Sequence, residues 1–426
     1  MSDFLAFPPA RSVGGTVRVP PSKSATNRAL LLAALTEDPV EIVGALVSED
    51  TRALRRCLEA MGASIVPTAE GLRVAGPLRG PAGREIPLDA GDSGTAARFL
   101  AAVAAAVPGR FLLGGSPRLS ERPIGELVVA LRGAGARIAY RGAEGCLPLA
   151  IEGGAVRSEE MVVDASRSSQ FLSALLLAGV AVDGGVRVRA SGAVVSWPYV
   201  ATTLEILREF GHAASSGPVF AVRRGAGAAA QFVTPGDYSS AVPLGAAVCA
   251  AGGAVTLSGL RWPSADADAL AFPVLERMGV AVTPEADGLA VRSVAGPTPR
   301  SASAVATDFP DAVPALAALA MLTHGESVFS GIGHLRLKES NRIASLVALA
   351  AAVGARAAES EDALAITGPA RPVPGVTRLP TFRDHRIAMA AGILALRLPG
   401  LLIEDPDCVS KSYPGFFRDL DALVRR

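Results

Sequence analysis

KSATNRALLLAAL, residues 23–35, is the first of six similar stretches from which the architecture of this chain can be predicted. Each stretch opens with a short polar turn and continues as a helix-length run of Ala, Leu and Val, and the starts recur at intervals of roughly 70 residues. Because the runs are apolar nearly all round, we expect buried helices. The other stretches are GDSGTAARFLAAV (91–103), SRSSQFLSALLLA (166–178), GDYSSAVPLGAAV (236–248), FPDAVPALAALAM (309–321) and RDHRIAMAAGILAL (383–396).

A second series of helices is predicted, with one member after each helix of the first series. Its apolar residues follow the i, i+3, i+4 pattern, as in Leu54, Leu58 and Met61, which is typical of half-exposed amphipathic helices. An alternating segment, a turn and a short strand follow, so each repeat is predicted to run strand, helix, strand, helix, hairpin. The series begins near Thr51, Ile124, Tyr199, Ala269, Asn341 and Pro414. Most members stop at a glycine suited to a left-handed C-terminal position, namely Gly62, Gly135, Gly211, Gly279 and Gly354.

The number of repeats predicts the number of domains. Single cores stop growing near about 250–300 residues, and each repeat needs a neighbour to cover its apolar face. Since the chain has 426 residues and six repeats, two domains of three repeats each is the economical arrangement. We therefore predict an α/β protein with two domains.

Net charge and cysteine spacing exclude several classes of protein. A formal net charge of +1 does not fit a nucleic-acid-binding protein, because phosphate-backbone binding needs a basic face. Any anion site must therefore be local. The cysteines have no C-x-x-C spacing and no nearby His, so we expect reduced thiols, no zinc and no disulfide. They are Cys57, Cys146, Cys249 and Cys408.

Two segments bear on cellular location. Residues 1–15 lack a basic n-region and an apolar h-region, so we expect no signal peptide and a cytoplasmic protein. Residues 241–260 carry no charge and have the length of a membrane span. Pro243, Gly252 and Gly253 interrupt that segment, which also lies in register with five soluble counterparts. We therefore expect no membrane helix there.

Lysine is rare in this chain and gathers at predicted helix starts. Lys23, Lys338 and Lys411 stand beside 38 arginines, so lysine remains where arginine would not serve. A compact ammonium can touch two ligands at one point and exchange a proton, whereas a guanidinium is a planar fork that stays protonated. The two asparagines, Asn27 and Asn341, lie within four residues of two of these lysines. We therefore expect the lysines to mark the functional site.

Cations and hydroxyls at the helix starts predict a site for anions. N–H groups and the dipole at a helix N-terminus favour anions, so several starts aimed inward would bind more than one phosphate. Few acids accompany them, chiefly Asp311 and Glu339, which would serve proton transfer. The cations and polar groups are Lys23, Ser24, Arg28, Gly94, Thr95, Arg98, Arg122, Ser168, Ser169, Gln170, Ser196, Tyr199, Lys338, Arg342, His385, Arg386 and Lys411.

Several of these residues have a purely structural alternative. Arg28 and Arg98 could cover apolar surface with their stems. Asp311 and Glu339 could be first-turn acids that only complement a helix dipole. A non-catalytic repeat scaffold would explain the period, but not why lysines and acids gather at helix starts. Serines at helix starts are commonly N-caps, an alternative that applies to Ser24, Ser93, Ser168 and Ser239.

Seven segments carry a family likeness: PSKSATNRALLLAAL, GDSGTAARFL, SERPIGEL, SSQFLSALLL, LRLKESNRI, FRDHRIAMA and SKSYPGFF. In this order and spacing they resemble the 5-enolpyruvylshikimate-3-phosphate synthase family, from Lys23 to about Lys411. The resemblance implies a two-domain inside-out α/β barrel with three repeats in each domain. It also implies that the chain crosses twice, with residues 21–234 in one domain and residues 1–20 and 235–426 in the other.

The resemblance implies a reaction and roles for the acids. The enolpyruvyl group of phosphoenolpyruvate would be transferred to the 5-hydroxyl of shikimate 3-phosphate, releasing phosphate by addition and elimination. Asp311 would be the base for the attacking hydroxyl, and Glu339, assisted by Lys23, would exchange a proton with the methylene carbon. The first domain would hold the sugar phosphate and the second phosphoenolpyruvate, in a cleft that closes. No cofactor or metal is implied, and the family suggests a monomer.

The same resemblance assigns two overlapping sets of residues to the substrates. Shikimate 3-phosphate would contact Lys23, Ser24, Arg28, Ser168, Ser169, Gln170, Ser196, Tyr199, Asp311 and Lys338. Phosphoenolpyruvate would contact Lys23, Gly94, Arg122, Gln170, Arg342, His385, Arg386 and Lys411.

The chain departs from the family pattern at several positions. Asp92 stands where the family often has Asn, which adds a negative charge near Gly94, and His334 stands where Asn or Glu is common. Because Gly94 is kept, we expect inhibition by glyphosate in competition with phosphoenolpyruvate. The other departures are Phe99 for Pro, Arg167 for a small apolar residue and Asn341 for Asp.

Two enzymes of related architecture are alternatives. The enolpyruvyl transferase that acts on UDP-N-acetylglucosamine has Lys-Asn where this chain has Lys23-Ser24, and a loop cysteine that residues 117–123 lack. RNA 3′-phosphate cyclase is built from related units, but the neutral charge and the lack of a nucleotide signature argue against it. Both alternatives are therefore weaker than the first.

Overall fold

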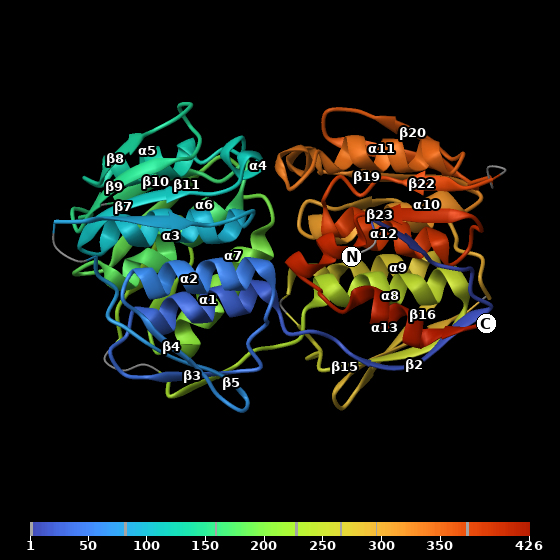
Figure 1. Ribbon diagram of the computed structural model, residues 1–426, viewed down its shortest axis with the longest axis horizontal. Helices are drawn as coiled ribbons and strands as arrows, with labels where there is room; N and C mark the ends of the chain where they lie inside the picture. Colours follow the sequence, from blue (N-terminus) through green and yellow to red (C-terminus); the bar gives the residue numbers. More distant parts are fainter. Residues whose placement is uncertain are drawn as a thin grey trace. The chain divides into compact units, whose positions relative to one another are not determined.

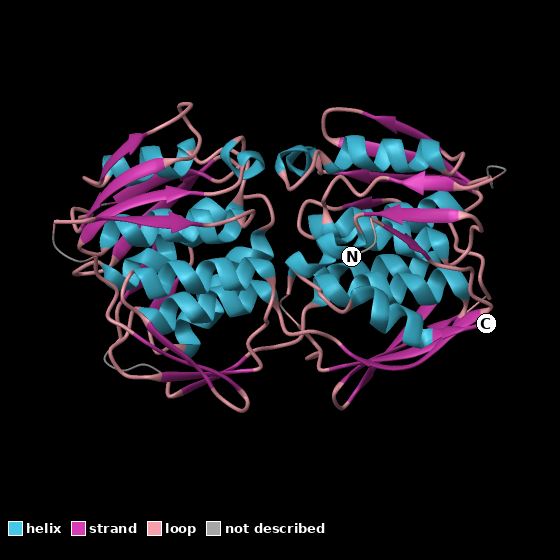
Figure 2. Ribbon diagram, viewed as in Figure 1, coloured by secondary structure: helices cyan, strands magenta, loops and turns pink. Residues whose placement is uncertain are grey.

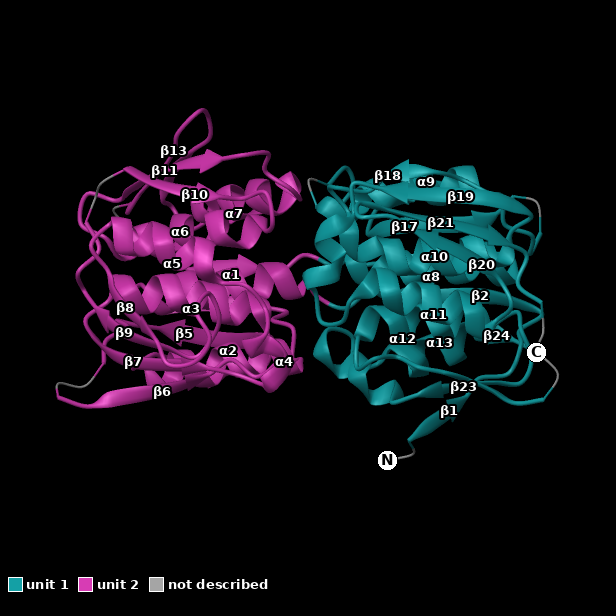
Figure 3. Cartoon of the chain, turned by 90° about the horizontal axis from the view of Figure 1, so that it is seen from above, with its two compact units in different colours: residues 1–20, 236–426 teal, residues 21–235 magenta. Residues whose placement is uncertain are grey.

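The computed structural model of the chain describes residues 3–80, 83–157, 160–225, 229–264, 266–294, 296–371 and 375–426 (Figure 1). In each unit helices lie in the middle of the fold, and strands with further helices lie around them (Figure 2). The chain divides into unit 1, Met1–Pro20 with Gly236–Arg426, and unit 2, Pro21–Pro235 (Figure 3). The α/β class and the repeated strand–helix architecture are thus confirmed.

The centre of unit 2 is formed by helices of the first predicted series. They are apolar nearly all round, so packing against one another removes most of their side chains from water. Leu31 and Phe99, for example, are 0% exposed. Each helix starts within a few residues of its predicted position. These helices are α1 (Lys23–Ala34), α3 (Gly94–Ala106) and α6 (Ser169–Ala178).

Mixed sheets surround the central helices of unit 2, and each combines a parallel strand pair with an antiparallel hairpin. The strand orders are β14-β3-β5-β4, β6-β7-β9-β8 and β10-β11-β13-β12. The bounds are β3 (Val40–Val43), β4 (Ser64–Pro67), β5 (Gly71–Ala75), β6 (Glu85–Asp89), β7 (Gly109–Gly114), β8 (Arg137–Tyr140), β9 (Leu149–Gly153), β10 (Glu160–Asp164), β11 (Val186–Ser191), β12 (Ala213–Ser215), β13 (Phe220–Arg223) and β14 (Gln231–Val233).

Helices of the second series lie on the outside of unit 2. The residues just after them, Gly62, Gly135 and Gly211, have φ angles of 101°, 93° and 78°, as expected for left-handed helix ends. These outer helices are α2 (Glu49–Ala60), α5 (Gly125–Gly133) and α7 (Trp197–Glu209). Two short helices, α4 (Pro117–Ser120) and η1 (Gly179–Ala181), complete the described part of unit 2.

Unit 1 follows the same plan. Gly279 and Gly354 end its outer helices with φ angles of 125° and 70°. The buried central helices are α8 (Tyr238–Ala251), α10 (Val313–Leu322) and α12 (His385–Ala395). The outer helices are α9 (Phe272–Met278), α11 (Arg342–Ala352) and α13 (Phe416–Leu423). The 3₁₀ helices are η2 (Ala267–Ala271), η3 (Pro310–Ala312), η4 (Gly333–Leu337) and η5 (Pro406–Lys411).

The sheets of unit 1 have the strand orders β16-β17-β15-β2-β24, β18-β19-β21-β20 and β1-β23-β22. Their bounds are β1 (Phe4–Ala6), β2 (Ser12–Arg18), β15 (Gly253–Ser258), β16 (Val280–Glu285), β17 (Gly288–Ser293), β18 (Ala304–Val305), β19 (Gly325–Ser330), β20 (Arg356–Glu359), β21 (Ala363–Gly368), β22 (Thr377–Leu379), β23 (Leu401–Glu404) and β24 (Val424–Arg425).

Two strands join a different repeat from the one they precede in sequence. Strand β2 comes before α1 but pairs in parallel with β15, and β14 comes before α8 but pairs in parallel with β3. The chain therefore passes from one unit to the other near Pro20 and again near Pro235. Hydrogen-bond pairing, rather than the next helix along the chain, decides the unit to which each strand belongs.

The last repeat differs from the prediction, because in the described chain no hairpin follows its outer helix α13. Residues 424–426 are too few for a hairpin, and β24 pairs with β2 instead. The N-terminal strand β1 pairs antiparallel with β23 and completes the sheet of this repeat. The first and last strands, β1 and β24, thus both belong to sheets of unit 1.

The described helices include none that is both long and apolar enough to cross a membrane. The uncharged residues 241–260 are divided at Gly252 between α8 and β15. The cysteines all lie in described ranges and form no disulfide, and burial raises the pKa of Cys57 and of Cys249 to about 12.

Candidate active site

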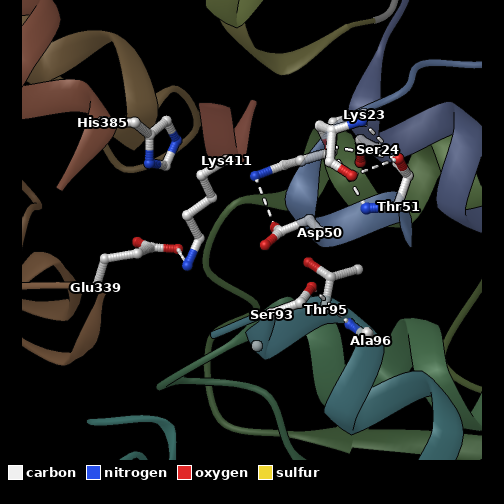
Figure 4. A network of polar contacts seen from close by, with 12 residues as sticks. Lys23, Ser24, Asp50, Thr51, Ser93, Thr95, Ala96, Glu339, His385 and Lys411 are labelled. Atoms are coloured by element: carbon white, nitrogen blue, oxygen red, sulfur yellow. Dashed lines mark hydrogen bonds and ion pairs between the residues drawn. The ribbon is translucent and has the colours of Figure 1, made fainter. Parts of the chain in front are cut away.

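Lys23 lies in the first turn of α1, and its ammonium faces a carboxylate of α2. The hydroxyl of Ser22 accepts the N–H of Ala25 at 3.2 Å, so Ser22 is the N-cap and the N-cap alternative for Ser24 is wrong. Lys23 Nζ lies 3.1 Å from Asp50 Oδ2 (Figure 4). Since the side chains of Lys23 and Asp50 are 14% and 4% exposed, this ion pair is largely withdrawn from water.

Arg28 joins α1 to α7 through bonds on each side of its guanidinium. Its Nε donates to Thr203 Oγ1 at 2.8 Å, and its Nη1 donates to Ser24 Oγ at 2.6 Å. Its Nη2 donates to the carbonyl of Tyr199 at 3.1 Å, and the group lies 5.2 Å from the ring centre of Phe99. Arg28 therefore does cover apolar surface, but its orientation is set by hydrogen bonds. We call these five residues the Arg28 clamp.

At the start of α3, two guanidinium groups lie against Gly94. A Cβ at Gly94 would come within 2.5 Å of Arg98 Nη1 and 2.8 Å of Arg122 Cζ, so a larger residue would displace both cations. Arg98 donates to the carbonyl of Gly94 at 2.9 Å. Ser93 caps α3, because its hydroxyl accepts the N–H of Ala96 at 3.2 Å, as the structural alternative for Ser93 states. The two cations thus lie together at the N-terminus of one helix.

At the start of α6, Ser168 is the N-cap and accepts the N–H of Gln170 at 3.3 Å. The amide of Gln170 donates to Thr95 Oγ1 at 3.3 Å, which links the starts of α6 and α3. Ser169, the first residue of α6, is buried. Arg167 forms a 2.7 Å ion pair with Glu126. Most of the polar residues predicted for the first domain therefore meet at neighbouring helix starts.

Unit 1 holds a second concentration of site residues around Arg342, the first residue of α11. Its guanidinium contacts Asp311 at 2.7 Å, Glu339 at 3.0 Å and Asp384 at 2.8 Å. The side chain of Arg342 is 1% exposed, so these ion pairs are made away from water. Such a buried cation is stable only while its carboxylate partners compensate it.

Further cations surround the same carboxylates. Lys338 Nζ lies 3.8 Å from Asp311 Oδ1, and Arg386 Nη2 lies 3.5 Å from Asp311 Oδ2. Lys411 Nζ lies 3.7 Å from Glu339 Oε1; both side chains are drawn in Figure 4. We name this set the Arg342 cluster, and its members are Asp311, Lys338, Glu339, Arg342, Asp384, Arg386 and Lys411.

The electrostatic state of Asp311 follows from this arrangement. Burial alone would raise the pKa of Asp311, but Arg342, Lys338 and Arg386 together hold that pKa well below its usual value. The carboxylate is therefore ionised and can accept a hydrogen bond, but it is a weak base in this state. Asp311 is a first-turn acid of η3, as the structural alternative states, but it also pairs with Lys338, Arg342 and Arg386, so it does more than complement a helix dipole. Glu339 precedes the N-cap Asn341, so it is not a first-turn acid of α11.

Asp384 connects several helix starts of unit 1. It caps α12 by accepting the N–H of Arg386 at 2.9 Å, and it also accepts the hydroxyl of Ser340 at 3.0 Å. Arg386 in turn donates to the hydroxyl and the carbonyl of Ser239, at the start of α8. Asp237 caps α8, so the N-cap alternative for Ser239 is wrong. His385 is buried beside this cap, with Nδ1 3.7 Å from Asp384 Oδ1.

Backbone strain coincides with the site residues. In the part of the chain that the structure describes, the non-glycine residues with positive φ are Ser196, Phe382, Arg383 and Asp405. Each lies at, or just before, the start of an element that carries site residues: α7 with Tyr199, α12 with Arg386, and η5 with Lys411. Such conformations cost about 1–3 kcal/mol each and persist where the surroundings enforce them.

The departures from the family pattern have structural explanations in part. Asn341 caps α11 by accepting the N–H of Ala344 at 3.2 Å. The carboxylate of Asp92 accepts the hydroxyl of Ser116. Burial, followed by the nearby Lys338, lowers the pKa of His334 to about 4, so its imidazole is neutral at pH 7. His334 lies in η4, four residues before Lys338.

Sequence reasoning missed several residues that these contacts include. Asp50, Thr203 and Asp384 were not among the predicted site residues, although Asp384 was recognised at a helix start. Their partners lie on other helices, and no local pattern indicates such pairs. The rare Lys23 and the repeated helix starts were the available signals. Within the described ranges, no group of three or more His, Cys, Asp or Glu residues is arranged to hold a metal ion.

Comparison with known proteins places this geometry in a family. A family model described as EPSP synthase (3-phosphoshikimate 1-carboxyvinyltransferase) matches residues 8–420. The 3-phosphoshikimate 1-carboxyvinyltransferase of Sulfurovum sp. (strain NBC37-1) is 36% identical and covers 98% of this chain and 99% of its own length. The same enzyme of Syntrophobacter fumaroxidans is 38% identical, with 97% and 98% covered.

Solved structures show the same relationship. The EPSP synthase structure from Acinetobacter baumannii superposes with a TM-score of 0.80 at 26% identity, covering 99% of this chain and 98% of that chain. The enolpyruvyl transferase NikO from Streptomyces tendae shares the fold, with a TM-score of 0.78 at 20% identity. The family model and the relatives, which extend over nearly the whole chain, show that this protein belongs to the EPSP synthase family.

Proposed function

We propose that the chain transfers the enolpyruvyl group of phosphoenolpyruvate to the 5-hydroxyl of shikimate 3-phosphate and releases phosphate. The observation that carries this proposal is the Arg342 cluster, in which two separate acids, Asp311 and Glu339, each lie beside a lysine and share one buried arginine. An enolpyruvyl transfer needs proton transfer at an oxygen and at a carbon, and it needs cations for phosphorylated substrates. The cluster contains both kinds of group.

We assign the sugar phosphate to unit 2. Its phosphate would lie against Ser168, Ser169 and Ser196, since a helix N-terminus with hydroxyls favours an anion. The rest of that substrate would meet Lys23 and residues of the Arg28 clamp. Gln170 of unit 2 and two residues of unit 1, Asp311 and Lys338, complete the proposed contacts. This half of the site is mostly hydroxyl and amide, which suits the polar groups of a shikimate ring.

We assign phosphoenolpyruvate to Arg342, Arg386 and Lys411 of unit 1 together with residues of unit 2. A phosphate carries about −1.5 to −2 charge near neutral pH, so a water-excluded site needs several fixed cations. Arg122 supplies one of them beside Gly94. The other proposed contacts are Lys23, Gln170 and His385.

Addition followed by elimination divides the proton transfers between the two acids. In the addition, Asp311 would take the proton of the 5-hydroxyl as its oxygen bonds to C2 of phosphoenolpyruvate. Glu339, assisted by Lys23, would give a proton to the methylene carbon, which becomes a methyl group. In the elimination, the C2–O bond to phosphate breaks, Asp311 passes the hydroxyl proton to the leaving phosphate, and the methyl group returns a proton to Glu339. The product is the enolpyruvyl ether and inorganic phosphate.

Substrate binding would also adjust the basicity of Asp311. Its pKa is held low by Arg342, Lys338 and Arg386. When anionic substrates pair with those cations, less positive charge acts on the carboxylate, so its pKa would rise toward the range of a useful base. The base would therefore become effective only when both substrates are bound.

The proposed contacts come from both units, so we propose that the site assembles when the units close on the substrates. Closure would exclude water and strengthen each ion pair. We expect the enzyme to act as a cytoplasmic monomer without a metal or a cofactor.

Phosphate release tests this function. Phosphate should appear when both substrates are present, in a one-to-one ratio with loss of phosphoenolpyruvate, and should not appear with either substrate alone. Release from one substrate alone would indicate a phosphatase and would overturn the proposal. Replacing shikimate 3-phosphate by UDP-N-acetylglucosamine should give no release.

A further inference from the structure

A buried hydroxyl on α7 lies at the centre of the helix contacts of unit 2. Thr203 is 0% exposed, so it cannot touch a substrate without rearrangement. Its Oγ1 accepts the Nε–H of Arg28 at 2.8 Å and donates to the carbonyl of Tyr199 at 2.8 Å. It also lies 3.0 Å from the hydroxyl of Ser173 on α6. One side chain thus connects α1, α6 and α7, which are neighbours in this unit.

The acceptor role of Thr203 follows from the chemistry of arginine. A guanidinium only donates, so a buried Nε–H needs an acceptor, and Thr203 supplies it. With Nε held by Thr203 and Nη1 held by Ser24, the plane of the guanidinium is fixed. Without that acceptor, the buried N–H would lose a bond and the group would turn about its stem.

Thr203 also acts on the backbone at the start of α7. The carbonyl of Tyr199 accepts from Thr203 and from Arg28, so both bonds hold the first turn of this helix. Ser196, which precedes that turn, has a left-handed φ of 54°. Holding such a strained residue requires firm contacts nearby, and the Arg28 clamp provides them.

We propose that Thr203 is a positioning residue for the sugar phosphate: it orients Arg28 and holds the first turn of α7 without touching the substrate. The inference rests on the proposed roles of Arg28 and Tyr199 in binding shikimate 3-phosphate. The inference predicts a specific kinetic effect. Loss of the Thr203 hydroxyl should weaken binding of shikimate 3-phosphate and leave the KM for phosphoenolpyruvate unchanged.

The test uses Thr203→Val, which keeps the branched shape and removes the hydroxyl, and Thr203→Ser, which keeps the hydroxyl. A hydrogen bond to a charged group contributes about 1.5–3 kcal/mol, so Thr203→Val should raise the KM for shikimate 3-phosphate about tenfold to a hundredfold. The KM of Thr203→Ser for shikimate 3-phosphate should stay within about threefold of that of the parent protein. An unchanged KM in Thr203→Val, or an equal rise in both KM values, would overturn the proposal.

Thr202→Val is the matched control. Thr202 is the neighbouring residue of α7, and its Oγ1 donates to the carbonyl of Pro198 at 3.0 Å, in the same i to i−4 manner. It therefore tests whether loss of a threonine hydroxyl from this turn is enough to change the kinetics. Neither KM should change in Thr202→Val. A rise equal to that of Thr203→Val would assign the effect to the helix rather than to Arg28.

A double substitution separates this inference from the proposed role of Arg28. Arg28→Lys should itself raise the KM for shikimate 3-phosphate. Adding Thr203→Val to the Arg28→Lys protein should raise this KM little further, because the guanidinium Nε is already absent. No effect of Arg28→Lys would refute the role of Arg28. A clear effect of Arg28→Lys with fully additive substitutions would refute the role of Thr203 alone.

A further variant covers the case in which Thr203→Val does not fold. Thr203→Cys places a weaker acceptor at the same position. It should raise the KM for shikimate 3-phosphate by less than Thr203→Val would, and Arg28→Lys should again suppress the difference. An unchanged KM in folded Thr203→Cys would count against the positioning role.

Discussion

The two units present site residues at the starts of similar helices, yet the charges at those starts differ. In unit 2 the group is mainly hydroxyls, an amide and cations, and Lys23 pairs with the carboxylate of Asp50. In unit 1 the carboxylates and cations of the Arg342 cluster interleave at 2.7–3.8 Å. The repeated fold thus supplies positions, and the side chains at each start determine the chemistry.

This difference suggests a division of labour. Hydroxyls and helix N-termini recognise a polar ring and its phosphate, but they do not move protons between carbon and oxygen. Two acids with separate lysines can do so. We therefore expect substitutions in unit 2 to alter mainly the binding of shikimate 3-phosphate, and substitutions at the acids of unit 1 to alter mainly kcat. Lys23 is the exception, because we assign it to both substrates and to proton transfer.

The largest expected effect is that of substituting Lys23. Lys23→Arg keeps the charge but replaces a compact ammonium by a fork that cannot exchange a proton. We expect kcat to fall by about 10⁴-fold or more, the upper end of what proton transfer contributes. Steady-state phosphate release measures it.

Arg137→Lys is the control for that substitution. Arg137 is 77% exposed and pairs with Glu152 on the surface of unit 2. Exchange of the two cations there should leave kcat and both KM values unchanged. If Lys23→Arg kept more than a tenth of the parent rate, the special role of lysine would be wrong.

The acids of unit 1 should show the next largest effect. Glu339→Gln and Asp311→Asn keep the shape of the side chains and remove their proton-transfer capacity. Each should lower kcat by about 10²–10⁴-fold, with smaller changes in KM. Near-normal turnover of Glu339→Gln would refute its assignment. Because both acids pair with Arg342, thermal unfolding should be measured to separate a loss of chemistry from a loss of fold.

Substitution of Gly94 should have an effect of intermediate size, which is expected in the binding of glyphosate. The parent enzyme should be inhibited by glyphosate in competition with phosphoenolpyruvate. In Gly94→Ala the added Cβ would displace Arg98 and Arg122, since it would lie 2.5 Å and 2.8 Å from their guanidinium atoms. Overpacking of this kind costs about 1–3 kcal/mol, so glyphosate should bind about tenfold to a hundredfold more weakly. Equal inhibition of both proteins would contradict this geometry.

The smallest expected effect concerns pH and stability, and it compares the units directly. Burial, followed by the nearby Arg224, lowers the pKa of His212 in unit 2 to about 4. The unfolded chain binds that proton near pH 6.5, so stability is complete above about pH 6.5 and is lost as the pH falls toward 4. The full difference in the free energy of unfolding is on the order of 3 kcal/mol. His334 should act in the same direction in unit 1.

His212→Asn tests this expectation, since its side-chain oxygen can accept the N–H of Gly225 that His212 Nδ1 accepts at 3.2 Å. Trp197 reports on unit 2 in a Trp262→Phe protein, and Trp262 reports on unit 1 in a Trp197→Phe protein. The loss of stability between pH 6.5 and 4 should become smaller for unit 2 and stay the same for unit 1. A similar change in both units would show that His212 is not the cause.

The central helices could be predicted because their signal is local. A polar turn followed by an apolar run of Ala, Leu and Val indicates a buried helix without knowledge of its neighbours. The helix-ending glycines could be predicted for the same reason. In contrast, the pairing of β2 with β15 depends on residues far apart in sequence, and no periodic pattern indicates it.

The site could be predicted only in part, for a related reason. Residue types that are rare or charged at helix starts, such as Lys23 and Arg342, were visible in the sequence. Which serine caps a helix was not, because Ser22 and Ser24 differ only in backbone position. Asp50 and Thr203 were missed because their importance comes from contacts with other helices.

Solvent deuterium in the product tests the central claim, that an acid of the Arg342 cluster protonates and deprotonates the methylene carbon, most directly. When the reaction is run in D₂O, the transient methyl group should gain deuterium through Glu339, and the enolpyruvyl product should retain part of it. Mass spectrometry of the product measures this. A product free of deuterium would contradict the account.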